Sequence, residues 1–130
     1  MAEKGFINEV GWVALGGMIG ASLRHSTNQL MLPYHADYHL FTATALENVL
    51  GSFLIGLIYI VLSKKIEKNK TLILFLLTGF IGSYTTYSGF MIEAFLISGE
   101  SFLLFLGYIF LQLVLGFFAL WLGLGVGKRF

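Results

Sequence analysis

Four runs of apolar residues, each long enough to cross a lipid bilayer, constrain this chain more than any other feature. They cover residues 6–31, 40–62, 71–97 and 102–126. A membrane-spanning helix needs about 20 mostly apolar residues. Unpaired backbone groups are so costly in lipid that helices are the natural structure for such runs. The sequence therefore predicts an all-α membrane protein, with four transmembrane helices in one domain over residues 1–130.

The composition supports lipid as the solvent and excludes several classes of function. Hydrophobic residues make up 57% of the chain and charged residues only 12%, whereas soluble domains carry about 25% charged residues. Cysteine is absent, which excludes disulfides and thiolate metal sites. We find no nucleophile motif, phosphate-binding loop or metal-binding helix motif, and we predict that the protein is not an enzyme. No cleavage-site pattern follows the N-terminal segment, so we expect it to remain as the first helix.

The basic residues are distributed unevenly between the two sides of the predicted helices. Arg24 alone lies towards one side, and the other seven of the eight lie near the termini and the second loop: Lys4, Lys64, Lys65, Lys68, Lys70, Lys128 and Arg129. Short loops rich in Lys and Arg stay in the cytoplasm. We therefore predict a multi-pass protein of the cell membrane with both termini in the cytoplasm.

The third run is interrupted by GFIGSYTTYSGF, from Gly79 to Phe90. Its glycines, hydroxyl residues and aromatics break an otherwise apolar helix. Backbone that leaves a helix within a bilayer persists only where protein, water or an ion satisfies it. We predict that this helix unwinds between Ile81 and Thr86, near its middle, and that the break is the functional centre.

Polar side chains also share faces on the neighbouring predicted helices. Thr44, Asn48 and Ser52 follow one another at intervals of four residues, which places them on one face of the second helix. In the fourth run, Tyr108 and Gln112 are four apart. Such faces either hold helices together or line a path, and Ser or Thr can also bond back to its own helix.

Two carboxylates lie within the predicted helices. Glu47 is next to Asn48, about 100° around the helix, and Glu93 follows the interruption. Carboxylates inside a bilayer are costly and are functional hypotheses by default. Arg24 ends the first run, where it can extend to the interface or pair with a helix C-terminus. Gly16 and Gly20 predict a close contact between helices.

Three segments together resemble the CrcB/Fluc family of fluoride channels. They are GASLRH (20–25), ENVLGSFLIG (47–56) and GFIGSYTTYSGFMIE (79–93). The first resembles the family's GxxxR end of helix one and places its arginine at Arg24. The second places the pore asparagine at Asn48, and the third is similar to the GFxGxxTTFSTFxxE signature. The resemblance covers nearly the whole chain, with the motifs in the family's order.

The resemblance implies passive export of fluoride from the cytoplasm, through two narrow pores at a dimer of antiparallel subunits. It also implies a structural sodium ion at the dimer centre, bound by the backbone carbonyls of Gly82 and Thr85. The pore or anion-binding residues that it implies, together with those on the polar faces, are Asn48, Tyr87, Ser88, Phe90, Tyr108, Gln112 and Thr44. Arg24, Glu47 and Glu93 are candidate modulators.

The chain departs from the family pattern at several positions. Tyr87 replaces a phenylalanine, Gly89 replaces a threonine, and Glu47 stands where a small or apolar residue is usual. A chain that inserts in both orientations needs little charge bias, and this chain has a strong one. We therefore predict a heterodimer with a sister chain of opposite orientation, with a homodimer as the alternative.

Two other functions remain as alternatives. One is a structural subunit that conducts nothing and completes the pore of a sister subunit. The other is a proton-coupled exporter like the small multidrug exporters, which also form four-helix antiparallel dimers. That class uses a carboxylate in the middle of its first helix, and this chain has none between Val10 and Leu23.

Overall fold

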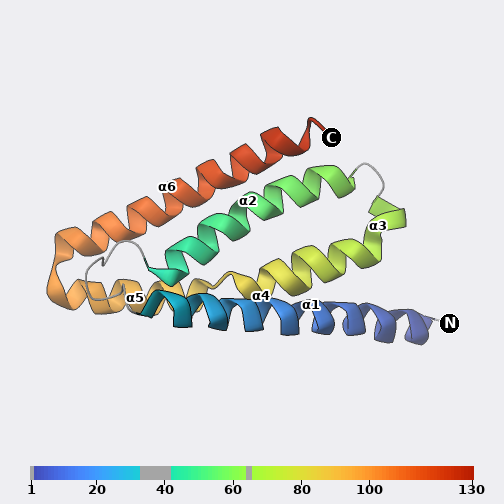
Figure 1. The fold of residues 1–130 in the computed structure, drawn as a ribbon, viewed down its shortest axis with the longest axis horizontal. Helices are drawn as coiled ribbons and strands as arrows, with labels where there is room; N and C mark the ends of the chain where they lie inside the picture. Colours follow the sequence, from blue (N-terminus) through green and yellow to red (C-terminus); the bar gives the residue numbers. More distant parts are fainter. Residues whose placement is uncertain (1, 33–41, 64–65) are drawn as a thin grey trace.

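The fold is a set of long helices, seen in a computed structural model that describes residues 2–32, 42–63 and 66–130 (Figure 1). The elements are α1 (Ala2–Met31), α2 (Ala43–Ser63), α3 (Ile66–Ile73), the π-helix η2 (Leu74–Ile81), α4 (Gly82–Tyr84), α5 (Tyr87–Glu100) and α6 (Phe102–Gly127). These ranges contain no strand. Four helical stretches are long and apolar enough to span a membrane: Gly5–Met31, Ala43–Ser63, Lys70–Glu100 and Phe102–Gly127. The four predicted membrane helices are confirmed.

The connections are shorter than the sequence predicts. The sequence predicts a charged loop at residues 63–70 and a tight turn at residues 98–101. In the structure, α3 already begins at Ile66 and α5 continues to Glu100. Ser101 alone joins α5 to α6. Its N–H donates to the Ile97 carbonyl at 3.1 Å, and its side chain accepts from the Leu104 N–H at 3.4 Å. One serine thus ends one helix and caps the next. Residues 40 and 41 of the predicted second helix lie outside the described residues.

Both termini, the C-terminal end of α2 and helix α3 lie at one end of the molecule, and the α5–α6 connection lies at the other (Figure 1). Lys68, Lys70, Lys128 and Arg129 therefore gather at the first end. Arg24 lies in the C-terminal part of α1, towards the opposite end. Lys64 and Lys65 lie outside the described residues.

Helix α1 packs against η2 at glycine positions. A Cβ atom at Gly16 would overlap the carbonyl oxygen of Phe75, and one at Gly20 would overlap that of Phe80. A Cβ atom at Gly79 would come within 2.6 Å of the Val13 carbonyl oxygen. Backbone meets backbone here, as is common between membrane helices with small residues. The predicted close contact at Gly16 and Gly20 is confirmed.

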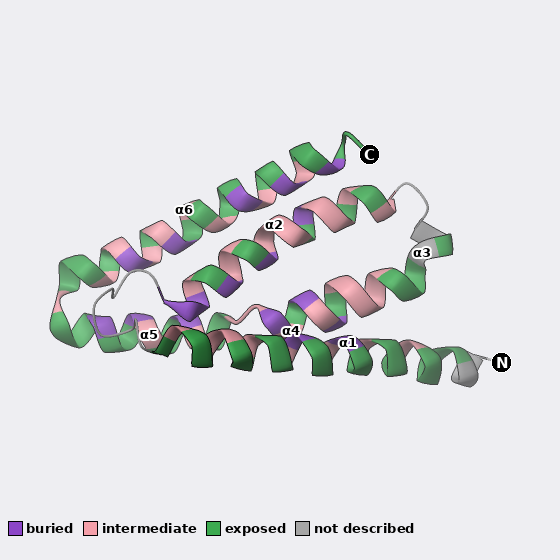
Figure 2. Ribbon diagram, in the orientation of Figure 1, coloured by how far each residue is buried: buried purple, intermediate pink, exposed green. Residues whose placement is uncertain are grey.

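Helices α2 and α6 form a second close pair. A Cβ atom at Gly123 would overlap the Phe53 carbonyl oxygen, and one at Gly56 would overlap the Leu120 carbonyl oxygen. Between α5 and α6, Phe90, Ala94, Ile97 and Tyr108 form a small buried cluster. Exposed residues occur along all the long helices, and most of all along α1 (Figure 2). Many of them are large and hydrophobic, as expected for helices that face lipid rather than water.

Candidate functional site

The backbone leaves helical geometry at Thr85 and Thr86. Helix α4 ends at Tyr84, and the next two residues are extended, with φ and ψ of −78° and 154° at Thr85 and −146° and 119° at Thr86. Helix α5 starts again at Tyr87. The Thr86 hydroxyl accepts from the Gly89 N–H at 3.0 Å and caps this new helix. The extended pair overlaps the C-terminal end of the predicted interruption, and the residues before it are π-helical and α-helical.

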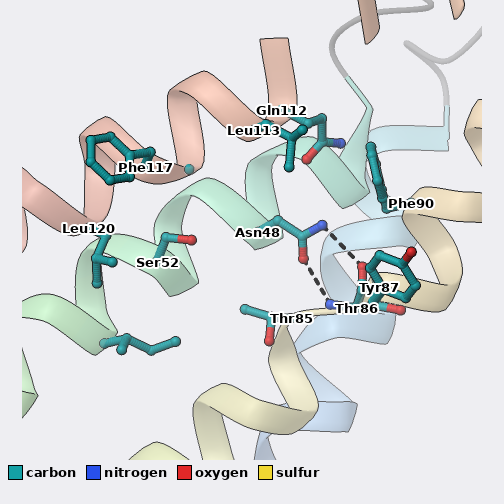
Figure 3. Close-up of a pocket in the computed structure, with 12 residues that line it drawn as sticks. Asn48, Ser52, Thr85, Thr86, Tyr87, Phe90, Gln112, Leu113, Phe117 and Leu120 are labelled. Atoms are coloured by element: carbon teal, nitrogen blue, oxygen red, sulfur yellow. Dashed lines mark hydrogen bonds between the residues drawn. The ribbon is translucent and has the colours of Figure 1, made fainter. Parts of the chain in front are cut away.

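Asn48 on α2 binds the backbone of Thr86 through both ends of its amide (Figure 3). Its Oδ1 accepts from the Thr86 N–H at 2.8 Å, and its Nδ2 donates to the Thr86 carbonyl at 3.1 Å. In a continuous helix the Thr86 N–H would donate to the Gly82 carbonyl. Because that N–H is taken by Asn48, the Gly82 carbonyl loses its usual partner.

Glycine lets α2 come this close to the extended residues. A Cβ atom at Gly51 would overlap the Thr85 methyl group, Cγ2. Thr85 itself is tied back to the preceding turn, since both its N–H and its hydroxyl donate to the Ile81 carbonyl, at 2.9 and 3.0 Å. The position of the extended pair is therefore fixed from α2 and from its own chain.

An open groove of about 420 Å³ runs between α2, α6 and the extended residues (Figure 3). Its polar lining includes Asn48, Ser52, Thr85, Thr86 and Gln112, and its apolar lining includes Phe90. Of the predicted polar face on α2, Asn48 and Ser52 lie in this groove. Thr44 lies one turn away and has a different partner.

Glu93 on α5 is the centre of a hydrogen-bonded network. Its Oε1 accepts from the Thr44 hydroxyl at 2.6 Å, and its Oε2 accepts from the Tyr108 hydroxyl at 2.5 Å. The Gln112 amide donates to the same Tyr108 oxygen at 2.8 Å. Phe90 stacks against Tyr108, with ring centroids 5.5 Å apart. The structure thus joins two predicted site residues, Thr44 and Tyr108, directly to the predicted modulator Glu93. Two more, Gln112 and Phe90, contact Tyr108.

Tyr87 and Ser88 do not join this network. Tyr87 is 75% exposed, and its ring centroid lies 6.1 Å from that of Phe90. Ser88 is also exposed, with its hydroxyl 3.2 Å from the Thr86 hydroxyl. Both side chains are exposed on the surface of the chain, and Tyr87 also lines the groove.

Glu47 lies away from the groove and faces α1. It is completely buried, and its Oε1 accepts from the Asn28 amide at 2.7 Å. The same amide nitrogen donates to the Arg24 carbonyl at 2.9 Å. A second open pocket of about 310 Å³ has a lining that includes Arg24, Asn28, Thr44 and Glu93. Within the described part of the chain, no ion pair joins Arg24 to a carboxylate.

Asn28 and the Thr86 backbone belong to the site but are not among the residues predicted from the sequence. Asn28 follows Arg24 by four residues, the same spacing that marks the polar face of α2. That spacing could have identified it. No sequence signal shows that Asn48 binds the Thr86 main chain, since the contact depends on how α2 packs against the break.

Replacing Tyr108 with phenylalanine is expected to lower stability while leaving the ring stack with Phe90 in place. The change removes one donor to Glu93 and the acceptor of the Gln112 amide, and an unpaired buried polar group costs about 1–3 kcal/mol. Thermal unfolding in detergent measures the effect. Tyr59→Phe is the matched control, because Tyr59 is 53% exposed and should unfold at the wild-type temperature. Equal unfolding temperatures for both variants would contradict the network.

Known proteins are similar to this chain over most of its length. Residues 11–124 match the family described as CrcB-like protein, Camphor Resistance (CrcB). The chain is 43% identical over 115 residues to the fluoride-specific ion channel FluC of Chlorobium chlorochromatii, covering 86% of each chain. It is 38% identical over 123 residues to that of Gloeothece citriformis, covering 93% of this chain and 98% of the relative. It is 32% identical over 116 residues to the fluoride-specific ion channel FluC of Thermosipho melanesiensis, covering 89% of this chain and 93% of the relative. The chain therefore belongs to the CrcB family.

Proposed function

We propose that this chain is a subunit of a fluoride-selective ion channel that lets fluoride leave the cytoplasm passively. Its relatives are named fluoride-specific ion channels. The observation that carries the proposal is the amide of Asn48, which holds an extended backbone segment beside a groove within the membrane-spanning helices. The pores form where two antiparallel subunits meet.

The groove offers groups suited to a small anion without its water. Asn48 uses one Nδ2 proton on the Thr86 carbonyl, which leaves the second proton for a ligand. Ser88 and Tyr87 add hydroxyls on the exposed surface. Aromatic rings have positive edges, so Phe90 can present an edge to fluoride. A narrow pore formed when a second subunit covers this groove would disfavour larger halides by size.

We also propose a structural sodium ion at the dimer centre, bound by the carbonyls of Gly82 and Thr85. Support comes from the Gly82 carbonyl, whose usual helical partner is bound to Asn48. Gly82 is exposed on the chain, as a site shared by two subunits requires. Backbone oxygens are suitable ligands for a hard cation. When bound, sodium would fix the two breaks against each other.

The partner in the dimer is a sister chain of opposite orientation. Basic residues gather at one end of the molecule, which favours one orientation with both termini in the cytoplasm. An antiparallel partner must therefore carry the opposite bias. The twofold axis is then only approximate, so the two pores need not be equally active.

Fluoride efflux from liposomes tests the function and the pairing together. We expect the chain reconstituted with its sister chain to release fluoride, and the chain alone to release at least about tenfold less, because its charge bias opposes antiparallel pairing. Robust efflux from the lone chain would establish a homodimer. No efflux from either preparation would contradict the channel function, and proton-coupled drug uptake into the same vesicles would identify an exporter.

A structural subunit is the other candidate within this family. It is favoured by Glu47, a buried carboxylate next to Asn48 in the sequence, whose charge would act against fluoride when ionised. A silent subunit tolerates replacement of Phe90 without a change in efflux from the heterodimer. A conducting one does not, because Phe90 lines the groove.

A further inference from the structure

Glu47 is a buried carboxylate that the proposed ion path does not use. Its side chain has no exposed surface. Oε1 accepts one hydrogen bond from Asn28, but Oε2 is buried without any hydrogen-bond partner, the one such side-chain atom in the described part of the chain. A buried polar atom of this kind requires an explanation, such as a bound ion or a proton.

The neighbouring groups do not supply that explanation. Asn28 is neutral and satisfies only one oxygen. Arg24 on α1 and Glu93 on α5 are the charged groups that act on Glu47 electrostatically, and their opposite signs partly cancel. Glu93 is already bonded to Thr44 and Tyr108. An ionised carboxylate buried without a direct counter-charge costs several kcal/mol.

We propose that Glu47 binds one monovalent positive charge at Oε2, between α1 and α2, and that this charge is a proton or a sodium ion. Either one neutralises the carboxylate. A proton converts it to the acid, and sodium takes oxygen ligands, among which Asn28 Oδ1 is available because the Asn28 hydrogen bonds run through Nδ2. This position is separate from the backbone carbonyls at the break.

The bound charge has a consequence for the anion path. Glu47 precedes Asn48 on α2, so its net charge acts near the amide that borders the groove. With the positive charge bound, α2 presents no net negative charge there. Without it, the carboxylate repels fluoride. We therefore expect efflux to rise as the site fills and to lose this response when Glu47 is replaced by glutamine.

Infrared spectroscopy of the purified protein tests the site without relying on ion flux. Glu47→Gln is a close isostere whose carbonyl can still accept from Asn28, so the fold is expected to survive. Subtracting the spectrum of this variant from that of wild type isolates one carboxyl group per chain. Spectra are recorded in choline and in sodium buffers over a range of pH. Glu9→Gln is the control, since Glu9 forms an exposed ion pair with Lys70.

Two results support the site and one overturns it. A protonated-carboxyl band at neutral pH, independent of sodium and lost only in Glu47→Gln, identifies a proton. A carboxylate band that shifts when sodium replaces choline identifies sodium. A carboxylate band that is the same in both buffers shows an ionised Glu47 without a bound cation and overturns the proposal, leaving Arg24 as the counter-charge. If Glu47→Gln fails to fold, Glu47→Asp provides the reference, because its band is expected at a different frequency. Loss of efflux in the liposome assay would leave each of these readings intact.

Discussion

Replacing Asn48 with alanine is expected to lower fluoride efflux by at least about tenfold. The change leaves the part-buried Thr86 N–H and carbonyl without their partners, and an unpaired group costs up to about 1–3 kcal/mol when it is buried. Since 1.4 kcal/mol corresponds to a factor of about ten in population, the extended geometry at Thr85 and Thr86 should become a minor state. Efflux from liposomes that contain the proposed heterodimer measures the loss.

Asn48→Asp separates support of the backbone from contact with the anion. Aspartate keeps an acceptor for the Thr86 N–H but loses the donor and places a negative charge at the groove. We expect this variant to stay folded and still lose efflux. Gln29→Ala is the control, because Gln29 is an exposed amide on α1. Wild-type efflux from both Asn48 variants would show that the groove carries no fluoride.

Replacing Gly123 with valine is expected to abolish the folded protein. A Cβ atom there overlaps the Phe53 carbonyl oxygen, so α2 and α6 must separate along their length. Overpacking typically costs about 1–3 kcal/mol, and the cost should be higher here because the atom in the way belongs to a backbone. Size-exclusion chromatography in detergent, followed by thermal unfolding, reports the outcome.

Gly125→Val provides an unusually close control for this experiment. Gly125 lies on the same helix two residues later, and a Cβ atom there has nothing within 4 Å. The two variants share composition, helix propensity and hydrophobicity. A folded Gly123 variant would contradict the packing of α2 on α6, whereas aggregation of both would point to a general effect of valine.

The sequence predicted the helices well because each membrane run is long and apolar. It could not predict the π-helix from Leu74 to Ile81, since Thr78 is the one polar residue in LFLLTGFI and a single position gives no period. The turn at residues 98–101 was also predicted too long. A serine that bonds to the helix on each side removes the need for a loop, and composition alone does not show those bonds.

For the polar residues of α2, the sequence predicted which face of the helix they occupy but not their hydrogen-bond partners. The spacing of Thr44, Asn48 and Ser52 correctly placed them along one side, and the offset of Glu47 placed it elsewhere. Their partners could not be predicted, because Glu93, Thr86 and Asn28 come from three different segments. Helix periodicity fixes direction within one helix, whereas hydrogen bonds depend on the packing of several.

The single serine between α5 and α6 limits how the channel can change its width. Ser101 forms hydrogen bonds to the last turn of α5 and the first turn of α6. The two helices are therefore expected to move together as one rigid body. Phe90 lies on α5 and Tyr108 on α6, so their rings stay stacked during such a movement. A constriction that opens or closes would therefore have its hinge elsewhere, at the extended threonines or at the contact with the proposed second subunit.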